Sequence, residues 1–270
     1  MVTALAVLCV RNESIHIRRC LRDLCMDGID VVLLDNDSTD DTVAKARAFL
    51  GHGLLAIERL PWRGVFALAD QLAAKERIAR SYDHDWLVHV DADEWLCPVG
   101  PSPSLLDGIA QADAAGYNCV NFNEFVFVPL RGESFETEEY ASLMKTYYFF
   151  EPYHPRLMRA WRRSSGLSNL AGSGHFLTGG EIRCSPRDFA LRHYVMLSEA
   201  HGRELYRQRP FASEELRIGM HENRLLIPDA ELGLVDAPAL RRLAYPNARD
   251  FDTAHPVTKH FWEWNALSAR

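Results

Sequence analysis

Two uninterrupted apolar runs near the N-terminus constrain the fold of this chain more than any other feature. Residues 4–10 and 31–34 contain no charged, amide or hydroxyl side chain, and such runs are typical of strands buried on both faces of a sheet. Between the runs, Ile17, Leu21 and Leu24 recur at helical spacing. The pattern predicts a strand–helix–strand unit with parallel strands and a right-handed crossover.

The same alternation continues along the first third of the chain. Helical patterns cover residues 40–50 and 66–80, and strand patterns cover residues 54–58 and 86–90. We therefore expect an α/β fold in which a mostly parallel sheet is flanked by helices. An apolar, aromatic stretch at 117–128 predicts one or two further strands. Short helices are expected from Ser198 onward, which makes the C-terminal part a mixed α+β region.

Three polar segments follow strands of the predicted sheet. They are residues 11–14, 35–38 and 91–94. Because the carboxyl ends of parallel strands meet at one edge of a sheet, we expect these segments to lie on a common rim. Ligands of open α/β sheets bind beyond that edge.

The charge balance excludes one broad class of function. The 270 residues contain 30 Lys and Arg and 37 Asp and Glu, for a formal net charge of −7. A protein this acidic is not expected to bind nucleic acid through a broad electrostatic surface. A polyanionic small molecule would need local compensation by a cation, by placed Arg or Lys side chains or by helix N-termini.

Cysteine spacing and hydropathy indicate the cellular compartment. The six cysteines are scattered without a CxxC pair, so we expect reduced thiols. The N-terminus lacks the basic region and cleavage site of a signal peptide. No apolar run approaches the roughly 18 residues that a membrane-spanning helix needs. These patterns predict a soluble, cytoplasmic protein.

A pair of carboxylates closes the strand expected at 86–90. Asp91 and Asp93 flank Ala92, and alternate side chains of a strand point the same way, so both could reach one hard cation. Mg²⁺ and Mn²⁺ take oxygen ligands and usually keep waters or substrate phosphates as well. An acidic strand end without a metal is the alternative, because one such triplet is weak evidence.

The three rim segments together carry a family resemblance. Residues 10–13 (VRNE), 32–42 (VLLDNDSTDDT) and 88–94 (VHVDADE) occur in that order at expected strand ends. This set resembles family 2 glycosyltransferases of the GT-A (Rossmann-like) fold over roughly residues 2–97. Residues 191–194 (LRHY), with Ser198 and Glu199, are similar to the histidine-bearing segment that closes the donor site in a bacterial branch with a DADE motif.

The resemblance implies a nucleotide-sugar donor and a set of residues that bind it. Asp35 matches the carboxylate that accepts a hydrogen bond from the base, usually uracil. Lys75 stands where the family has an Arg that reaches the diphosphate, so it keeps the charge but lacks the bidentate fork. Arg63 is either a second diphosphate contact or a surface cation. The full expected donor set is Val10, Arg11, Asn12, Glu13, Asp35, Arg63, Lys75, Asp91 and Ala92.

The resemblance also implies a metal site. Asp91, Asp93 and His193 would bind Mn²⁺ or Mg²⁺, and an imidazole ligand suits Mn²⁺ better than Mg²⁺. Glu94 would support the metal ligands or bind the transferred sugar. Without the resemblance, a histidine in an apolar stretch such as His193 is more often a structural residue.

The reaction that the resemblance implies is attack by an acceptor hydroxyl on the anomeric carbon of the donor, with inversion. Such a displacement needs a general base. Glu124, in an otherwise apolar strand, and His175, in a Gly-rich loop, are the two candidates. Glu124 could equally be a glutamate on the exposed face of a strand.

The expected acceptor is a glycan or a lipid-linked glycan, with at most peripheral membrane association, as in surface polysaccharide biosynthesis. His221, Phe261, Trp262 and Trp264 could line an acceptor face, although core packing explains most of them better. We expect a catalytic domain at 1–197, with a nucleotide-binding half at 1–97 and an acceptor half at 98–197. A helical extension would follow at 198–270.

Two other functions share parts of this pattern. A sugar-phosphate nucleotidyltransferase would use similar carboxylates, but its first strand is usually followed by a Gly-rich loop. Residues 11–14 contain no glycine, which also disfavours a dinucleotide dehydrogenase. A catalytically silent domain that binds nucleotide sugars or glycans is the non-enzymatic alternative.

Overall fold

The computed structural model describes residues 1–98, 102–207, 209–217 and 237–264. The chain divides into two compact units that are interleaved along the sequence. Unit 1 consists of Met1–Trp62, Leu68–Asn123 and Pro155–Leu191, and unit 2 consists of Arg63–Ala67, Glu124–His154 and Arg192–Arg270. The expected domains at 1–197 and 198–270 stay a prediction.

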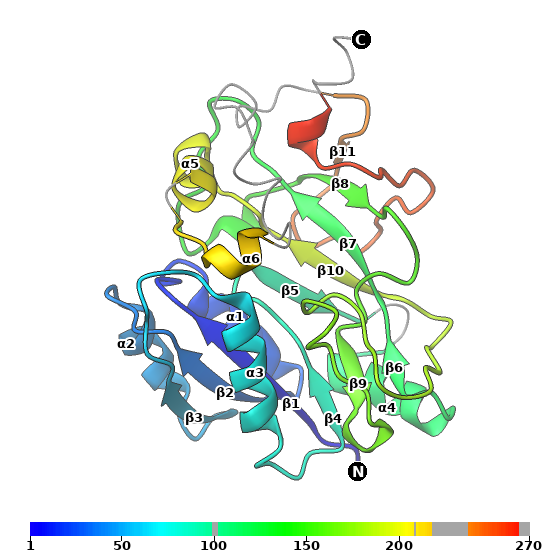
Figure 1. The fold of residues 1–270 in the computed structure, drawn as a ribbon. Coiled ribbons are helices and arrows are strands. Elements are labelled where there is room, and N and C mark those ends of the chain that lie inside the picture. Colours follow the sequence, from blue (N-terminus) through cyan, green and yellow to red (C-terminus); the bar gives the residue numbers. More distant parts are fainter. Residues whose placement is uncertain (99–101, 208, 218–236, 265–270) are drawn as a thin grey trace. The chain divides into compact units, whose positions relative to one another are not determined.

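Unit 1 contains a six-stranded sheet in the order β3-β2-β1-β4-β9-β6 (Figure 1). β1 pairs in parallel with β2 and β4, and β2 pairs in parallel with β3. β9 lies antiparallel between β4 and β6. The strands are β1 (Ala4–Val10), β2 (Asp30–Asp35), β3 (Leu54–Arg59), β4 (Trp86–Val88), β6 (Cys119–Val120) and β9 (Ala160–Arg162).

Helices connect these strands much as the hydrophobic spacing predicts. The helix expected at 40–50 is a short α-helix that continues as a 3-10 turn, and the helix expected at 66–80 begins and ends slightly inside those bounds. In unit 1 the described α-helices are α1 (Ile17–Met26), α2 (Thr42–Ala46), α3 (Leu68–Ala79) and α4 (Leu105–Ala114), and the 3-10 turns are η1 (Arg47–Phe49) and η3 (Arg163–Ser165).

The side chains of β1 alternate between two hydrophobic cores. The even-numbered residues from Ala4 to Val10 belong to a core that also contains residues of α1 and α4. Leu5 and Val7 belong to a second core with residues of α3. Both faces of β1 are therefore covered, which explains why its sequence is apolar throughout.

The connection order reverses at β1. The chain proceeds from β1 to β2 and β3 on one side and returns with β4 on the other side of β1. In open α/β sheets, ligands bind beyond the carboxyl ends of the strands at such a reversal. The loops that begin at Arg11, after β1, and at His89, after β4, therefore lie at the position where a ligand is expected.

The strand expected at 86–90 is shorter than predicted. β4 ends at Val88, and residues 92–93 form a turn that leads into β5 (Glu94–Cys97). The directions of Asp91 and Asp93 are thus set by a turn. The strand alternation from which we expected the two carboxylates to converge does not apply there.

The second sheet has the order β11-β8-β7-β10-β5. β8 pairs antiparallel with β7 and with β11. The chain passes from one unit to the other within β7 and within β10. The strand pattern predicted at 117–128 is confirmed by β6 and β7. The strands not yet given are β7 (Phe122–Phe127), β8 (Thr146–Phe150), β10 (Phe189–His193) and β11 (Arg241–Arg242).

Unit 2 is rich in aromatic contacts and short helices. The rings of Phe125 and Phe251 stack with centroids 3.9 Å apart, and Phe127 lies against Tyr194 at 4.9 Å. The short helices expected after Ser198 are confirmed. They are α5 (Glu199–Arg207) and α6 (Ser213–Arg217), and the 3-10 turns η2 (Tyr140–Ser142) and η5 (Phe261–Glu263) also belong to this unit.

The six cysteines are free thiols, as their spacing predicts. Burial raises the pKa of the Cys9 thiol to about 12. A thiol with such a pKa is protonated at neutral pH and is a poor nucleophile.

None of the helices within the described residues is both long and apolar enough to cross a bilayer.

Gly108 in α4 provides a test of the packing between this helix and Phe189. A Cβ added to Gly108 would lie 2.7 Å from Cζ of Phe189. An alanine normally stabilises a helix by about 0.5–1 kcal/mol relative to glycine, but overpacking costs about 1–3 kcal/mol. We therefore expect Gly108→Ala to lower the free energy of unfolding in urea. Gln111→Ala, on the exposed side of α4, is the control and should change it by less than about 0.5 kcal/mol. A Gly108→Ala protein as stable as the wild type would contradict the tight contact.

Candidate functional site

The loops after β1 and β2 are tied together through Arg11. Its guanidinium donates to the backbone oxygen of Asn36 over 2.7 Å and also to that of Asp37. The same group lies 4.1 Å from the ring centroid of Trp62, a cation–π distance. Arg11 therefore holds the end of β2 and the segment after β3 in one place.

Asn12 and Glu13 add further ties to the same loop. The N–H of Asn12 donates to Oγ of Ser38 over 3.0 Å, and Oδ1 of Asn12 accepts from the N–H of Thr39 over 2.8 Å. Asn12 has a φ of +57°, which Asn tolerates better than most residues. The N–H of Glu13 donates to Oγ1 of Thr42 over 2.7 Å. The expected nucleotide segment is thus a rigid loop.

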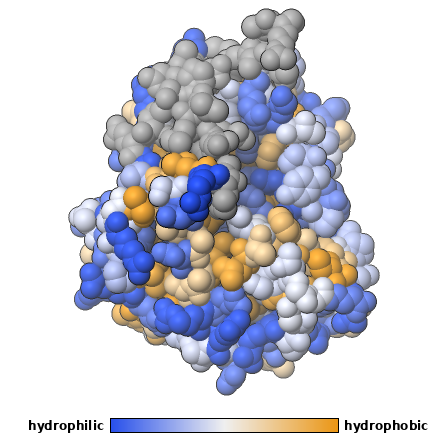
Figure 2. Space-filling model, viewed as in Figure 1, coloured by the Kyte–Doolittle hydropathy of each residue, from blue (hydrophilic) through white to orange (hydrophobic). Residues whose placement is uncertain are grey.

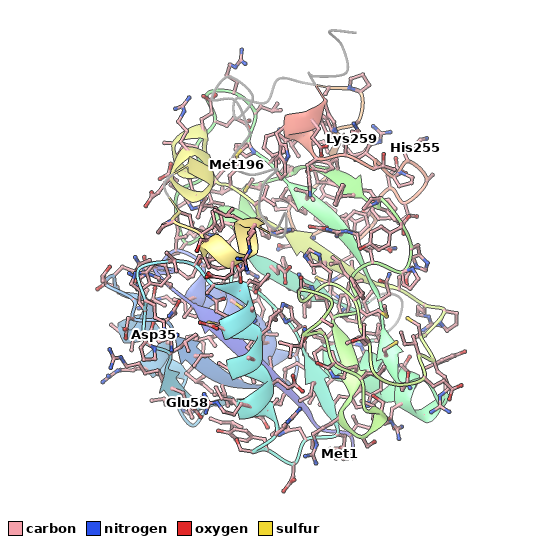
Figure 3. The ribbon with its side chains drawn as sticks, viewed as in Figure 1. Met1, Asp35, Glu58, Met196, His255 and Lys259 are labelled. Carbon is pink, nitrogen blue, oxygen red and sulfur yellow. The ribbon has the colours of Figure 1, made fainter. Side chains whose placement is uncertain are left out.

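Asp35 and Asp37 shape the end of β2. The N–H of Ser38 lies 3.2 and 3.3 Å from the two carboxylate oxygens of Asp35, which Figure 3 labels at the end of the strand. Asp37 accepts from Arg59 over 2.5 and 3.0 Å and from the N–H of Trp62 over 2.9 Å. The hydrogen bond from Arg59 is the main reason that the pKa of Asp37 is lowered.

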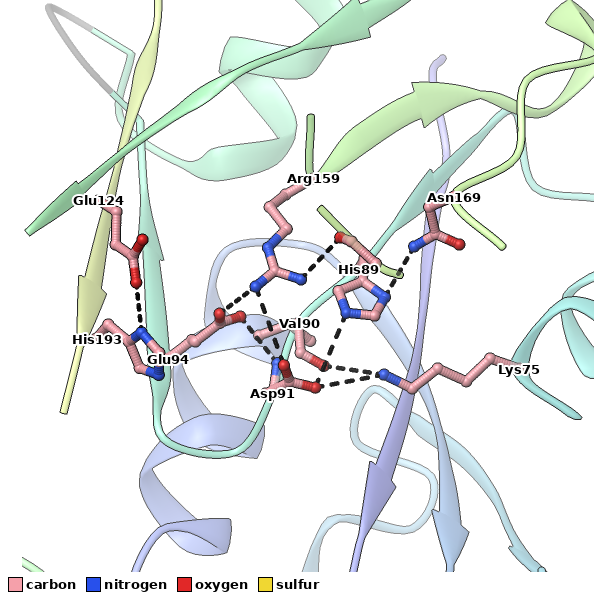
Figure 4. A network of polar contacts seen from close by, with 10 residues as sticks. Lys75, His89, Val90, Asp91, Glu94, Glu124, Arg159, Asn169 and His193 are labelled. Carbon is pink, nitrogen blue, oxygen red and sulfur yellow. Dashed lines mark hydrogen bonds and ion pairs between the residues drawn. The ribbon is translucent and has the colours of Figure 1, made fainter. Parts of the chain in front are cut away.

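The turn that carries the expected metal carboxylates is held by buried charged side chains. The N–H of Asp91 donates to Oε2 of Glu94 over 3.0 Å, and Oε1 of Glu94 accepts from Arg159 (Figure 4). Arg19 of α1 donates to the backbone oxygens of Ala92 and Glu94 over 3.0 and 2.8 Å. Glu94 is 1% exposed, Arg159 3% and Arg19 4%. The backbone of the turn is therefore fixed by groups that water does not reach.

Three basic side chains face the carboxylate of Asp91. Nζ of Lys75 lies 3.5 Å from Oδ1, Nε2 of His89 lies 3.9 Å from Oδ1, and a terminal nitrogen of Arg159 lies 3.9 Å from Oδ2 (Figure 4). The side chain of Asp91 is 50% exposed, whereas that of Lys75 is 10% exposed. Lys75 and Asp91, two of the residues expected to bind the donor, are thus neighbours. The positive charges of Lys75 and Arg159 can also compensate negative charge on a bound ligand.

His89 is neutral in this environment. Nδ1 of its ring accepts from the amide of Asn169 over 2.9 Å, which leaves the proton on Nε2, the nitrogen nearer Asp91. Burial lowers the pKa of His89, and the charges of Lys75 and Arg159 lower it further. The imidazole therefore contributes a polar N–H rather than a third positive charge.

A pocket of about 260 Å³ adjoins these residues in unit 1. Leu5, Leu87 and Trp161 line its apolar part, and Lys75 and His89 also contribute to its wall. The molecular face in Figure 2 shows apolar patches among mostly polar residues. The pocket thus shares two side chains with the surroundings of Asp91.

The carboxylates at this turn are oxygen ligands of the kind that a hard cation prefers. Within the part of the chain that the structure describes, no group of three or more His, Cys, Asp and Glu side chains could hold a metal ion. Mg²⁺ commonly binds through one or two protein carboxylates and completes its shell with waters and substrate phosphates. Asp91 and Asp93 supply two carboxylates at one turn, and their joint binding of a cation stays a prediction.

Two further expected residues, Glu124 and His193, meet in unit 2. Oε1 of Glu124 lies 2.6 Å from Nδ1 of His193 (Figure 4). From the sequence we expect Glu124 to be a candidate base and His193 to be a metal ligand. The structure joins them in one hydrogen bond.

The remaining candidates are exposed, buried in a hydrophobic core or outside the described residues. Arg63, in unit 2, and His175, in unit 1, are exposed. His175 follows Gly174, whose backbone oxygen accepts from Arg159 over 3.1 Å, and its charge contributes to the lowered pKa of His89. Phe261 and Trp262 are buried in a core of unit 2, in agreement with the packing alternative. His221 lies outside the described residues.

Arg19 and Arg159 are the residues that sequence reasoning left without a role. Two residues along a helix correspond to a rotation of about 200°, so Arg19 lies opposite Ile17 and the apolar stripe of α1. Periodicity therefore predicts that Arg19 is exposed. Residues 156–163 contain four arginines, so no sequence signal separates Arg159 from its neighbours.

A comparison with family models places the chain in a known family. The model described as "Glycosyl transferase family 2" matches residues 6–161, which is more than half of the 270 residues. The chain therefore belongs to glycosyl transferase family 2. The predicted fold class, an α/β fold of the GT-A type with a mostly parallel sheet flanked by helices, is confirmed. The narrower bacterial branch stays a prediction.

Similar proteins of known sequence are uncharacterized glycosyltransferases. One from Rickettsia conorii is 31% identical over 91 residues, or 34% of this chain and 29% of the relative. One from Rickettsia prowazekii is 31% identical over 86 residues, or 32% of this chain and 26% of the relative. The chain thus matches less than a third of the length of these relatives.

Similar solved structures include S. aureus TarS. One TarS structure has a TM-score of 0.45 and 13% sequence identity, and it covers 76% of this chain and 40% of that chain. A structure of TarS residues 1–349 has a TM-score of 0.44 and 12% identity, and it covers 76% of this chain and 62% of that chain.

The buried pair of Arg159 and Glu94 should be essential for stability. Arg159→Met leaves the carboxylate of Glu94 without its buried cation, and such a loss destabilises by about 3–5 kcal/mol. We expect this decrease in the free energy of unfolding in urea. Arg80→Met breaks an exposed pair with Glu76 and should cost at most about 1 kcal/mol. Equal effects of the two substitutions would contradict the role of the buried pair.

Proposed function

We propose that the protein is a metal-dependent glycosyltransferase that transfers a sugar from a UDP-linked donor to an acceptor hydroxyl. The observation that carries this proposal is the cluster around Asp91 at the reversal of strand order. An exposed carboxylate there faces the cations of Lys75 and Arg159, and membership of glycosyl transferase family 2 supplies the reaction class.

The loops after β1 and β2 are proposed to bind the nucleoside. Val10, Arg11, Asn12 and Glu13 would frame the base and ribose, and the carboxylate of Asp35 would accept a hydrogen bond from uracil. The hydrogen bonds of Arg11 and Asn12 support this assignment because they hold the loop in place before the donor binds. A preorganised site loses less conformational entropy on binding.

The donor diphosphate is proposed to lie near Asp91 and Lys75. Asp91 and Asp93 would hold Mn²⁺ or Mg²⁺, with His193 as a further expected ligand and Ala92 beside the donor. When bound, the cation supplies Lewis-acid stabilisation of the charge that grows on the departing diphosphate. The ammonium of Lys75 adds a fixed positive charge, while Arg159 keeps the turn in position through Glu94. Arg63 stays a candidate for a second contact with the diphosphate.

The acceptor side requires a group that removes the proton of the attacking hydroxyl. An inverting displacement needs a base for the acceptor hydroxyl, and Glu124 and His175 stay the candidates. We propose a glycan or lipid-linked acceptor of a surface polysaccharide pathway and a cytoplasmic location. No nucleic acid is expected as a partner of a chain with a net charge of −7.

Asp93→Ala tests the metal assignment. The substitution removes one of two carboxylates, so stabilisation by UDP should lose its dependence on Mn²⁺, and Mn²⁺-dependent donor hydrolysis or transfer should be lost. Thermal-shift titration with UDP, with and without Mn²⁺, measures the first effect. Asp83→Ala, which changes an exposed acid, is the matched control and should behave as wild type. Normal Mn²⁺ dependence in Asp93→Ala would remove Asp93 from the site.

Lys75→Met tests the position of the diphosphate. Loss of the ammonium should weaken UDP binding about tenfold or more, because a hydrogen bond to a charged group contributes roughly 1.5–3 kcal/mol. Uridine binding should stay unchanged. Isothermal titration calorimetry with the two ligands measures both constants, and Lys259→Met, at an exposed lysine, is the control. Equal weakening of uridine and UDP would place Lys75 away from the phosphates.

A further inference from the structure

The hydrogen bond between Glu124 and His193 joins a buried acid to a partly exposed imidazole. Glu124 lies in β7 and is 4% exposed, and His193 is the last residue of β10, with a side chain that is 22% exposed. Their contact, 2.6 Å between Oε1 and Nδ1, is short for a nitrogen–oxygen hydrogen bond, as expected when charge assists it. The acid is therefore inside and the imidazole reaches toward the surface.

This contact determines which nitrogen of His193 carries the proton. A carboxylate only accepts hydrogen bonds, so an ionised Glu124 makes Nδ1 of His193 the donor, and in the neutral ring Nε2 then bears the lone pair. His89 has the opposite tautomer because its Nδ1 accepts from Asn169. Nε2 of His89 can therefore donate a hydrogen bond, whereas Nε2 of His193 presents a lone pair.

Two other contacts between a histidine and a carboxylate among the described residues are more exposed. His84 contacts Asp30, whose side chain is 44% exposed, and His255 contacts Asp252, whose side chain is 29% exposed. Water competes for such carboxylates, whereas the carboxylate of Glu124 is sheltered from it. A sheltered acid behind a histidine is the arrangement that fixes ring orientation in metal sites.

We propose that Glu124 is a positioning residue that acts through His193. It holds the imidazole in the tautomer whose Nε2 can bind a divalent transition-metal ion. The inference rests on the proposed function, in which a cation accompanies the donor. It gives Glu124 a role other than that of an independent base, and it predicts that Glu124 affects metal preference as well as transfer. Because imidazole suits transition metals and Mg²⁺ prefers oxygen ligands, the pair should favour Mn²⁺ over Mg²⁺.

The tautomer can be measured in the free protein. Two-bond ¹H–¹⁵N correlation spectra of histidine-labelled protein at about pH 8, above the usual histidine pKa of about 6.5, distinguish the two neutral forms. We expect the Nδ1–H form for His193 in the wild type. Glu124→Ala should lose this preference, and Glu124→Gln, which keeps an acceptor oxygen, should largely retain it. An Nε2–H form in the wild type would overturn the inference.

Metal binding in the presence of UDP provides the second test. Loss of such a supporting partner typically weakens metal binding about 10–100-fold, so we expect this decrease in Mn²⁺ affinity for Glu124→Ala, with little change for Mg²⁺ and partial recovery in Glu124→Gln. The double variant Glu124→Ala/His193→Ala should bind Mn²⁺ no more weakly than His193→Ala. Asp30→Ala, which removes an exposed partner of His84, is the control and should leave Mn²⁺ binding unchanged.

The outcomes separate this inference from the proposed function. If UDP binding by the wild type is independent of Mn²⁺, the metal-dependent function itself fails, and with it the inference. If the wild type requires Mn²⁺ but Glu124→Ala binds it normally, or if the effects of the two single substitutions add fully, only the positioning role is wrong. Circular dichroism and metal-free uridine binding identify a variant that has lost its fold. If Glu124→Ala has lost its fold, the Mn²⁺ affinity and the His193 tautomer of Glu124→Gln test the positioning role instead.

Discussion

The parallel pairing of β1 with β2 on one side and β4 on the other is the constraint on which the candidate site depends. In this pairing Val10 lies opposite Asp35, so the loops after β1 and β2 begin side by side at one edge of the sheet. β4 stops at Val88, which pairs with Ala6, and the chain then turns through Asp91. The uncharged, apolar sequence of β1 permits this central position, because both of its faces are covered by helices.

Electrostatic compensation around Asp91 follows from that placement. The carboxylate is half exposed, yet its neighbours Lys75, His89 and Arg159 are buried. A buried ammonium or guanidinium needs a nearby negative charge, and Asp91 and Glu94 provide it within the protein. We propose that the same cations serve the diphosphate when a donor binds.

Local sequence patterns predict the parts of this structure that depend on local physics. The apolar run at Ala4–Val10 identifies a buried central strand, and alternation of strands and helices implies that Asp35 and Asp91 share one edge of the sheet. Patterns of this type report burial and periodicity, so they could not reveal that β4 ends at Val88, where a turn replaces the last part of the expected strand.

Long-range polar contacts are the part that no single sequence pattern could supply. Arg19 lies on the polar side of its helix by periodicity, yet it is buried where it donates to the backbone oxygens of Ala92 and Glu94. The hydrogen bond between Glu124 and His193 joins residues 69 positions apart. Glu124 and His193 can both be recognised as candidates from the sequence, but the partner that determines the role of each appears only in the folded chain.

A crystal structure of the protein with UDP and Mn²⁺ tests the central claim most directly. The account predicts Mn²⁺ bound to a carboxylate of the Asp91 turn at about 2.0–2.2 Å, the usual distance for a small divalent cation. The diphosphate should lie near Lys75, and the uracil should contact the loops that follow β1 and β2. UDP bound elsewhere, or bound there without any metal contact to Asp91 or Asp93, would contradict the account.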